Sequence, residues 1–303
     1  MTAAVKSRFL DLRSLAALEH MRFTTRHRID GAFSGRNRSQ SKDGAGEFVD
    51  YREYSAGEDP RRLDWKVLAR SGRAYIRLYQ DETNLTCTLA LDTSASMLFG
   101  GQRAATKGLN KLAYAQYLAT ALSYIIARGQ DQVGLALLGE RLREMIPPGG
   151  TTTHLARLHA TIESIGTEPG TKMAAALEQL FEKSTRRGVL LLVSDFLMED
   201  LEEVFSAIRQ FRHRQWETVV LHLIDPDEER LPEGVAYRFE GLEQEGSIDC
   251  SPAEIRREYE NRFALHVATV RSMALALACD YRPISTVVDY LQVLRGFLVE
   301  RAG

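Results

Sequence analysis

The sequence has little cysteine and no long apolar run, and each shortage removes a class of protein. Its three cysteines, Cys87, Cys250 and Cys279, are far apart and form no CxxC pair. This spacing argues against a disulfide scaffold and predicts a reducing, cytoplasmic setting. The longest apolar run, residues 117–127, is interrupted by Thr120 and Ser123 and falls short of the ~20 residues that a membrane span needs. We therefore expect no membrane span.

The sequence also lacks an excess charge of either sign, with 39 Lys and Arg against 41 Asp and Glu. Its overall field is therefore weak and offers no general attraction for nucleic acid. Residues 1–46 carry a local basic excess, but no aromatic interleaving or known binding motif accompanies it. Charges also stand where a secretory signal would need an apolar segment. We expect neither nucleic-acid binding nor secretion.

What the sequence does have is 303 residues with 44% apolar content, enough for a large domain with an appendage. Short apolar strands alternate with helices from residue 84 onward, which favours a doubly wound, mostly parallel α/β sheet flanked by helices. We therefore predict an α/β domain at residues 84–303 and an N-terminal helical and strand extension at residues 1–83. The strands are expected at residues 85–91, 131–138, 189–193, 217–224 and 280–284, with a further short strand before Pro147 and a hairpin at 235–250.

The extension contains an arginine-rich segment with acidic residues interspersed, a pattern consistent with an ion-paired docking surface. A helix is predicted to begin at Pro60 with Asp59 as its N-cap. This helix is expected to pack Trp65 on the sheet, because a buried aromatic ring is the ordinary outcome. Residues 75–79 alternate in polarity and are predicted to form a strand.

Polar side chains follow two of the predicted strands where each one ends. Asp92 follows residues 85–91, and Asp195 follows residues 189–193. In such sheets ligands bind beyond the carboxyl ends of the strands, so these carboxylates are expected at one rim. Thr171 opens a helix from a third loop and could point to the same rim. The predicted site contains five residues: Asp92, Ser94, Ser96, Thr171 and Asp195.

Two carboxylates and three hydroxyls are oxygen ligands of the kind that hard cations prefer. The sequence therefore predicts a site for Mg²⁺, with Mn²⁺ or Ca²⁺ as alternatives. Zinc is disfavoured, because no histidine or cysteine belongs to the set. Each residue also has an ordinary structural explanation, since aspartate and threonine commonly cap turns and helices.

These residues resemble a known binding site. The pattern Asp92-x-Ser94-x-Ser96, followed by Thr171 and Asp195, is similar to the metal-ion-dependent adhesion site of von Willebrand factor A domains. A second stretch resembles the signature of the bacterial domain-of-unknown-function family 58. It contains Gly46-Glu47-Phe48, Arg52-Glu53-Tyr54, Gly57-Glu58-Asp59, Arg61, Leu63-Asp64-Trp65 and Ala69-Arg70. The order of predicted elements extends the resemblance to the C-terminus.

The resemblance implies a von Willebrand factor A-like fold and assigns roles at the site. Ser94, Ser96 and Thr171 would bind the cation directly, while Asp92 and Asp195 would act directly or through water. A partner's acidic side chain would complete the coordination shell. The resemblance also implies a MoxR-type AAA+ ATPase as partner, and so a role as an adaptor or co-chaperone in an ATP-driven assembly.

Two other functions remain open from the residues. A Mg²⁺-dependent phosphohydrolase could use an aspartate after a first strand as its nucleophile, but the position where a second carboxylate is usual holds Ser94. No P-loop, GxSxG or HExxH motif is present, so we expect no catalytic residues and no enzyme activity. Alternatively, the protein could be a metal-independent scaffold that binds through its arginine-rich segment.

Overall fold

The computed structural model describes residues 7–25, 47–55, 63–80, 85–101, 109–184, 187–231, 233, 237–242 and 246–302. The chain forms two compact units, one of Met1–Thr25 with Leu85–Gly303 and one of Arg26–Asn84. The predicted division placed all of residues 1–83 in one extension. The structure instead groups the start of the chain with the larger unit, because apolar side chains of this segment are buried in the core of that unit.

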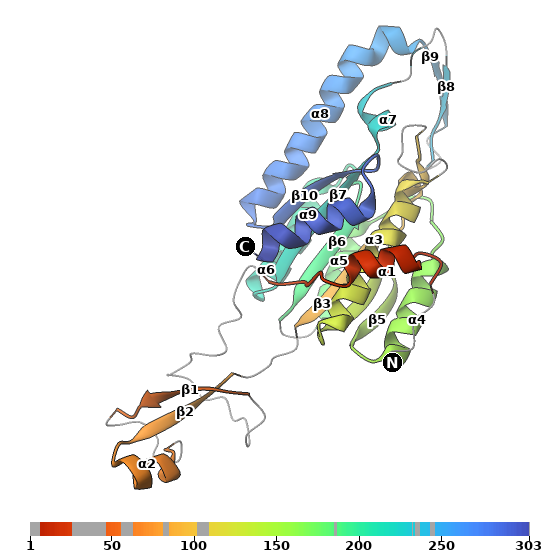
Figure 1. Ribbon diagram of the computed structural model, residues 1–303. Coiled ribbons are helices and arrows are strands. Elements are labelled where there is room, and N and C mark those ends of the chain that lie inside the picture. The colour runs from red at the N-terminus through yellow and green to blue at the C-terminus, as the bar shows by residue number, and fades with distance from the viewer. Residues whose placement is uncertain are drawn as a thin grey trace. The chain divides into compact units, whose positions relative to one another are not determined.

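A six-stranded sheet with the order β10-β7-β6-β3-β4-β5 forms the centre of the larger unit (Figure 1). Five strands are parallel, and β5 runs antiparallel at one edge. The predicted doubly wound, mostly parallel α/β fold is therefore confirmed. The strands are β3 (Thr86–Asp92), β4 (Gln132–Leu138), β5 (Leu142–Gly149), β6 (Val189–Ser194), β7 (Glu217–Ile224) and β10 (Asp280–Ser285).

Helices cover both faces of this sheet, because alternate residues of the buried strands point to opposite sides. Leu89 and Leu91 of β3 pack in the core with α1, α3, α4 and α9. Ala90, between them, packs in a second core with α5, α6 and α8. The bounds are α1 (Leu12–Leu18), α3 (Lys111–Arg128), α4 (Thr152–Glu163), α5 (Met173–Lys183), α6 (Leu201–His213), α8 (Pro252–Ala276) and α9 (Tyr290–Ala302).

The apolar run at residues 117–127 lies in α3, a helix that is buried along most of its length. Its hydroxyl residues Thr120 and Ser123 are themselves buried, and the Ser123 hydroxyl donates to the Thr120 carbonyl oxygen at 2.8 Å. The run is therefore part of a protein core. Among the helices of the described residues, none is long and apolar enough to cross a membrane.

An appendage leads from the end of β7 to α8. It consists of α7 (Pro226–Glu229), an antiparallel hairpin of β8 (Tyr237–Glu240) and β9 (Ser247–Cys250), and the long helix α8 (Figure 1). The hairpin appears where the sequence predicted it. Of α8, only Pro252, Val270 and Ala274 are buried, so most of this helix is accessible to solvent.

The start of the chain packs on the larger unit through aromatic and aliphatic side chains. Phe9 makes an edge-to-face contact with Tyr117, with 4.8 Å between ring centroids. Leu18 and Phe23 are buried in the same core as α3 and α9. Burial of these apolar groups stabilises the attachment and explains why the domain prediction was wrong for residues 7–25.

The smaller unit contains an antiparallel pair, β1 (Glu47–Glu53) with β2 (Tyr75–Gln80), and α2 (Trp65–Ser71). Asp64 caps α2, accepting from the backbone N–H groups of Lys66 and Val67. The predicted start at Asp59 and Pro60 lies outside the described residues. The prediction that Trp65 is buried is wrong, because its side chain is 62% exposed. Trp65 is the first residue of α2, and the helix turns this position outward.

Candidate metal site

Asp92 and Asp195 lie on either side of the point where the strand order reverses. From β3 the chain adds β4 and β5 on one side, and then β6, β7 and β10 on the other. Ligands of doubly wound sheets bind beyond the carboxyl ends of the strands at this switch point. Because Asp92 ends β3 and Asp195 follows β6, the fold brings together two carboxylates that are distant in sequence.

The Asp92 carboxylate is buried and held on both oxygens. Its Oδ1 accepts from the Ser94 backbone N–H at 2.9 Å, and its Oδ2 accepts from the Ser194 hydroxyl at 2.6 Å. Burial and the nearby Asp195 charge raise the pKa of Asp92 to about 7, and the bonds from Ser194 and Ser94 oppose that rise. Within the part of the chain that the structure describes, no positively charged side chain is paired with Asp92.

The two serines of the same loop lie side by side. The Ser94 and Ser96 hydroxyl oxygens are 2.9 Å apart, and Ser94 is buried. Ser96 is the second residue of the short 3₁₀ turn Ala95–Leu98 in this loop. Its hydroxyl also forms a hydrogen bond with Asp195. Four of the five predicted residues thus interact with one another: Asp92, Ser94, Ser96 and Asp195.

Thr171 has a different set of contacts. Its hydroxyl donates to the Gly139 carbonyl oxygen at 3.2 Å, beyond the end of β4. The loop that carries it does reach the site, since the Glu168 backbone N–H donates to the Thr93 carbonyl oxygen at 3.0 Å. Thr171 therefore lies on a neighbouring loop, and its role as a metal ligand stays a prediction.

Lys111, at the start of α3, brings a positive charge that the sequence reasoning missed. Its ammonium is buried, donates to Asp195 Oδ2 at 2.6 Å and forms a second ion pair with Glu228 of α7. Burial alone raises the pKa of Asp195, but the Lys111 charge and hydrogen bonds outweigh it and lower that pKa. Burial lowers the pKa of Lys111, yet its two carboxylate partners raise it overall. The Lys111–Asp195 pair is therefore ionised.

His222 of β7 supports the Asp195 backbone. Burial lowers the pKa of His222 to about 4, so the ring is neutral at neutral pH. Its Nε2 lies 3.0 Å from the Asp195 carbonyl oxygen, and its Nδ1 lies 2.8 Å from the Tyr281 hydroxyl. A carbonyl oxygen only accepts, so Nε2 carries the proton and Nδ1 accepts from Tyr281. This tautomer holds the strand end that presents Asp195.

Asp225 is a further buried carboxylate near the site, and it is a residue that the sequence could have indicated. It follows the apolar strand β7 as Asp195 follows β6. Its Oδ2 accepts from the Thr286 hydroxyl at 2.8 Å and from the Gly101 backbone N–H at 3.2 Å. A Cβ at Gly101 would collide with the Asp225 and Asp227 carboxylates. Asp225 thus links the loop after β3 to α7.

The donor set fits a hard divalent cation. Of the residues that the structure describes here, the carboxylates Asp92, Asp195, Asp225 and Glu228 are buried with one lysine, Lys111, and buried charge without a counter-charge is costly. Within the described part of the chain, no group of three or more His, Cys, Asp and Glu side chains could hold a metal. A cation would therefore depend on the hydroxyls of Ser94 and Ser96 in addition to carboxylates, which suits Mg²⁺ and its retained waters.

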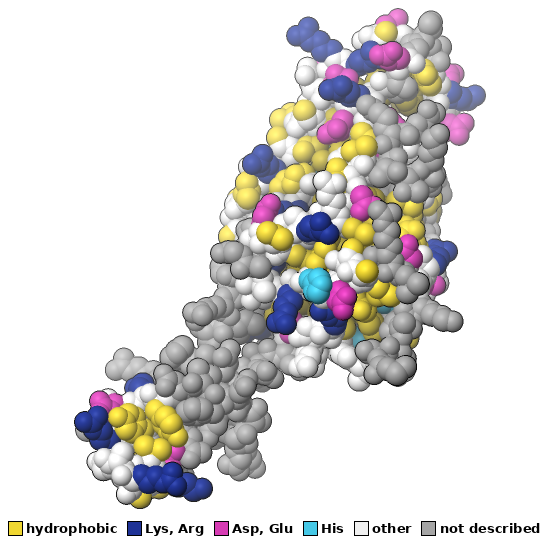
Figure 2. Space-filling model, in the orientation of Figure 1, with side chains coloured by type: hydrophobic (Ala, Val, Ile, Leu, Met, Phe, Trp, Pro, Cys, Tyr) yellow, Lys and Arg dark blue, Asp and Glu magenta, His cyan; other side chains and the backbone are white. Residues whose placement is uncertain are grey.

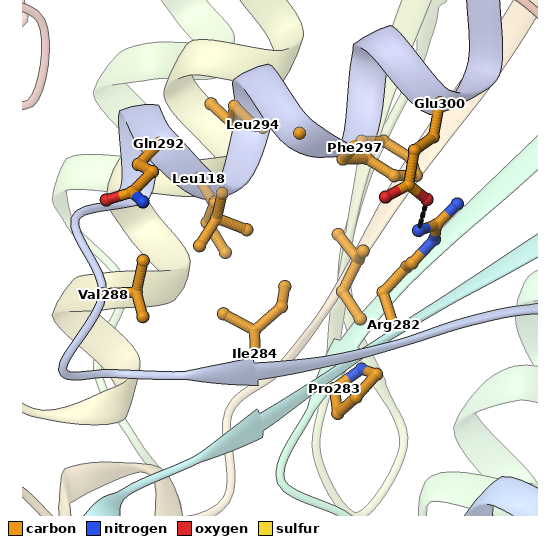
Figure 3. A pocket seen from close by; sticks show the side chains of 12 residues that line it. Leu118, Arg282, Pro283, Ile284, Val288, Gln292, Leu294, Phe297 and Glu300 are labelled. Atoms are coloured by element: carbon orange, nitrogen blue, oxygen red, sulfur yellow. Dashed lines mark hydrogen bonds and ion pairs between the residues drawn. The ribbon is translucent and has the colours of Figure 1, made fainter. Parts of the chain in front are cut away.

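A separate cavity of about 290 Å³ lies between α9 and β10 (Figure 3). Leu118, Ile284 and Phe297 give it an apolar lining, and the ion pair between Arg282 and Glu300 lies at one end. Its two charged groups bond to each other and present no set of converging oxygen donors. The rim at the switch point is therefore the better candidate for an ion site.

Comparison with known proteins identifies the family. A family model described as "Protein of unknown function DUF58" matches residues 50–269. The chain belongs to this DUF58 family.

The DUF58 chain has relatives and structural neighbours that span most of its length. It is 26% identical to the uncharacterized protein Rv1480 of Mycobacterium tuberculosis, over 96% of this chain and 90% of that one. A crystal structure of an aerotolerance-related membrane protein from Bacteroides fragilis matches with a TM-score of 0.50 and 18% identity, over 72% of this chain and 99% of that one. This match shows a similar fold.

A crystal structure of the SpRpn10 VWA domain also matches, with a TM-score of 0.41 and 8% identity, over 71% of this chain and 95% of that one. A likeness this distant carries no argument about function.

Proposed function

We propose that this DUF58 protein is a metal-dependent protein–protein interaction module. The observation that carries the proposal is the convergence of the Asp92, Ser94, Ser96 and Asp195 oxygens at the switch point of the sheet. Among the described residues that are buried around these groups, carboxylates outnumber cations. Mg²⁺ is the proposed ion, because it takes oxygen ligands and keeps several waters.

In this proposal Asp92, Ser94 and Ser96 hold the cation, and Asp195 contributes negative charge from the neighbouring strand end. The cation would supply a positive centre for a carboxylate of the partner. The Ser194 hydroxyl and the Ser94 backbone N–H orient Asp92, while His222 positions the Asp195 backbone. The site would thus be preorganised before a partner arrives, which lowers the cost of binding.

The partner that we propose is a MoxR-type AAA+ ATPase in the cytoplasm, with this protein as its adaptor or co-chaperone. This part of the proposal rests on the family resemblance, and the site supports it only by fitting an acidic side chain. The decisive experiment is capture of a purified MoxR-type ATPase by wild type in Mg²⁺, wild type in EDTA and Asp92→Ala in Mg²⁺. We expect retention only by wild type in Mg²⁺.

Asp249→Ala serves as the matched control, because the Asp249 side chain is 78% exposed and pairs only weakly with Arg238. Its retention of the ATPase should equal that of wild type. Equal retention in EDTA and by Asp92→Ala would contradict a metal-bridged interface, and would direct attention to the smaller unit.

We propose a role without enzyme activity, against the alternative of a Mg²⁺-dependent phosphohydrolase. Asp92 follows the central strand as a phosphohydrolase nucleophile would. Two residues on, however, the chain has Ser94, whose hydroxyl contacts Ser96 and cannot act as a carboxylate acid or base. An assay with a general phosphate ester in Mg²⁺ should give no turnover. Turnover that Asp92→Asn abolishes would establish the enzyme instead.

A second candidate function, metal-independent docking through the smaller unit, is favoured by the surface of α2. Trp65 is largely exposed, and Lys66, Arg70 and Arg73 are exposed beside it. Figure 2 shows hydrophobic side chains together with Lys and Arg side chains on this unit. Lys66 and Arg70 lie four residues apart and so share a helix face. An acidic protein surface would complement this one.

Tryptophan fluorescence distinguishes the two candidates. Trp65 is exposed and Trp216 is buried at 1%, so a Trp216→Phe variant reports on α2 alone. Docking through α2 should shift the Trp65 emission to the blue in EDTA as well as in Mg²⁺. Lys66→Glu/Arg70→Glu should then abolish the complex. If the emission does not move while the complex forms, α2 is not the interface.

A further inference from the structure

Lys111 makes its contacts at the centre of the proposed site. It is the first residue of α3, and its backbone N–H donates to the Phe99 carbonyl oxygen at 2.9 Å. Phe99 ends the 3₁₀ turn that contains Ser96. The Lys111 side chain is fully buried, and its ammonium lies 5.6 Å from the centre of the Phe99 ring. The lysine is thus anchored to the same loop as the predicted ligands.

The Lys111 ammonium donates a hydrogen bond to a carboxylate oxygen of Asp195 that a metal ion would coordinate. Asp195 Oδ2 accepts from Lys111 at 2.6 Å, and Asp195 Oδ1 accepts from the Leu197 backbone N–H at 3.1 Å. Both carboxylate oxygens therefore have a donor already. A divalent cation next to Asp195 would repel the ammonium strongly, because Lys111 and Asp195 are both buried and buried charges interact over a low effective dielectric. Lys111 and a metal ion therefore compete for Asp195.

The second partner of Lys111 lies in the appendage. Glu228 Oε1 pairs with the ammonium, and Glu228 Oε2 accepts from the Asp225 backbone N–H at 3.1 Å. The Tyr259 hydroxyl of α8 donates to the Glu228 carbonyl oxygen at 2.8 Å. Contacts thus run without a gap from Asp195 through Lys111 and Glu228 to α7 and α8.

We propose that Lys111 is a built-in cation that competes with a divalent metal for Asp195 and couples the metal site to α7 and α8 through Glu228. This inference rests on the proposed metal-dependent function and adds a regulator to it. When a cation binds, the ammonium moves its interaction from Asp195 toward Glu228. The short helix α7 and the start of α8 respond to the bound metal through this chain of contacts.

Titration calorimetry with Mg²⁺ tests the competition, using Lys111→Met, Glu228→Gln and wild type. Lys111→Met removes the competing charge and keeps an unbranched side chain, so Mg²⁺ affinity should rise at least about tenfold. Glu228→Gln leaves Asp195 as the remaining carboxylate partner of the ammonium among the described residues, so affinity should fall. A purely structural lysine would not give these opposite changes. Lys183→Met, at an exposed position of α5, should leave affinity unchanged.

A double variant distinguishes an effect on folding from an effect on the competition between Lys111 and the metal ion. Lys111→Met leaves Glu228 buried without the Lys111 ammonium, and this lowers the folded fraction several-fold. Lys111→Met/Glu228→Gln removes both charges and should also bind Mg²⁺ at least as tightly as wild type. Circular dichroism of each variant shows that it is folded before the titration. Unchanged or weaker binding by both variants would overturn the proposal.

Hydrogen exchange tests the coupling. In wild type, Mg²⁺ should change amide exchange in α7 and in the first turns of α8, and Lys111→Met should show no such change. If Mg²⁺ binds to wild type but exchange there does not move, the coupling is wrong and the metal site stands. If neither wild type nor Lys111→Met binds Mg²⁺, both this inference and the proposed function fail.

Discussion

At the scale of single residues, Gly296 in α9 gives the simplest test of the packing. It lies inside the helix at the wall of the cavity, and a Cβ added there would have no atom within 4 Å. Alanine restricts the unfolded chain and favours the helix. We expect Gly296→Ala to raise the free energy of unfolding by about 0.5–1 kcal/mol, measured by urea denaturation.

Gly134→Ala is the matched control for that measurement. A Cβ on Gly134 of β4 would lie 2.7 Å from the Ile146 carbonyl oxygen of the neighbouring strand, so this variant should be less stable than wild type. If both substitutions changed the free energy of unfolding in the same direction, the free space beside Gly296 would be contradicted.

His159 provides a pH prediction at the same scale. It is buried, its Nε2 lies 2.9 Å from the Ser123 hydroxyl oxygen, and burial lowers its pKa from 6.5 to about 4. The unfolded chain therefore binds the proton more tightly than the folded one. The contribution to stability is full above about pH 6.5 and is lost as pH falls toward 4, at up to about 1.4 kcal/mol per pH unit.

Urea denaturation of wild type and His159→Gln at pH 7.5 and pH 5 measures this effect. Between pH 7.5 and pH 5, the free energy of unfolding of the wild type should fall by up to about 2 kcal/mol more than that of the variant. Other titrating groups contribute equally to both proteins and cancel. Equal losses would mean that His159 is protonated in the folded protein.

At the scale of elements, Arg301 connects the start of the chain to the end of the sheet opposite the candidate site. Its buried guanidinium forms ion pairs with Asp280 of β10 and Glu217 of β7. Its Nε also donates to the Thr24 carbonyl oxygen at 2.8 Å, and the Thr24 hydroxyl donates back to the Arg301 carbonyl oxygen. One residue thus joins α9, two strands and the segment of residues 7–25.

Removing this guanidinium takes a buried cation away from two buried carboxylates, of which Asp280 keeps its ion pair with Arg282. We expect Arg301→Met to lower the free energy of unfolding by about 3–5 kcal/mol. Arg262→Met should lower the free energy of unfolding by no more than about 0.5 kcal/mol, because the ion pair between Arg262 and Glu258 is exposed on α8. Thermal or urea unfolding of the two variants decides this, and similar losses for both would contradict the buried position of Arg301.

At the scale of the whole molecule, a bound cation should stabilise the larger unit by mass action. A ligand at 100 times its Kd adds about 2.7 kcal/mol, which corresponds to a rise of at least about 4 °C in Tm for a domain of this size. We expect Mg²⁺ to raise Tm of wild type in a thermal melt. Asp92→Ala should melt at the same temperature in Mg²⁺ and in EDTA.

Asp249→Ala again gives the control, and it should respond to Mg²⁺ as wild type does. A Tm that rises equally in Asp92→Ala would show that Mg²⁺ acts elsewhere on the molecule. No rise in wild type at millimolar Mg²⁺ would argue that Lys111 alone supplies the positive charge of the site.

Much of the fold could be predicted from the sequence, because its strands are short apolar runs and its helices begin at recognisable caps. The strand β7 occupies the predicted residues 217–224. The predicted site was found from carboxylates placed directly after strands, and the same rule applied to residues 217–224 would have indicated Asp225. Trp65 was misplaced because the burial of one aromatic side chain depends on which way its helix is turned.

The sequence by itself determined which residues lie at strand ends, since a strand of apolar residues stops where a carboxylate must reach solvent or a partner. Only the tertiary structure decided which strand ends meet, and that Lys111 and Glu228 lie beside Asp195. Lys111 and Asp195 are 84 residues apart, and no local pattern marks such a pair. Their contact arises because the sheet order places β3 beside β6 and the helix after the site loop turns its first side chain inward.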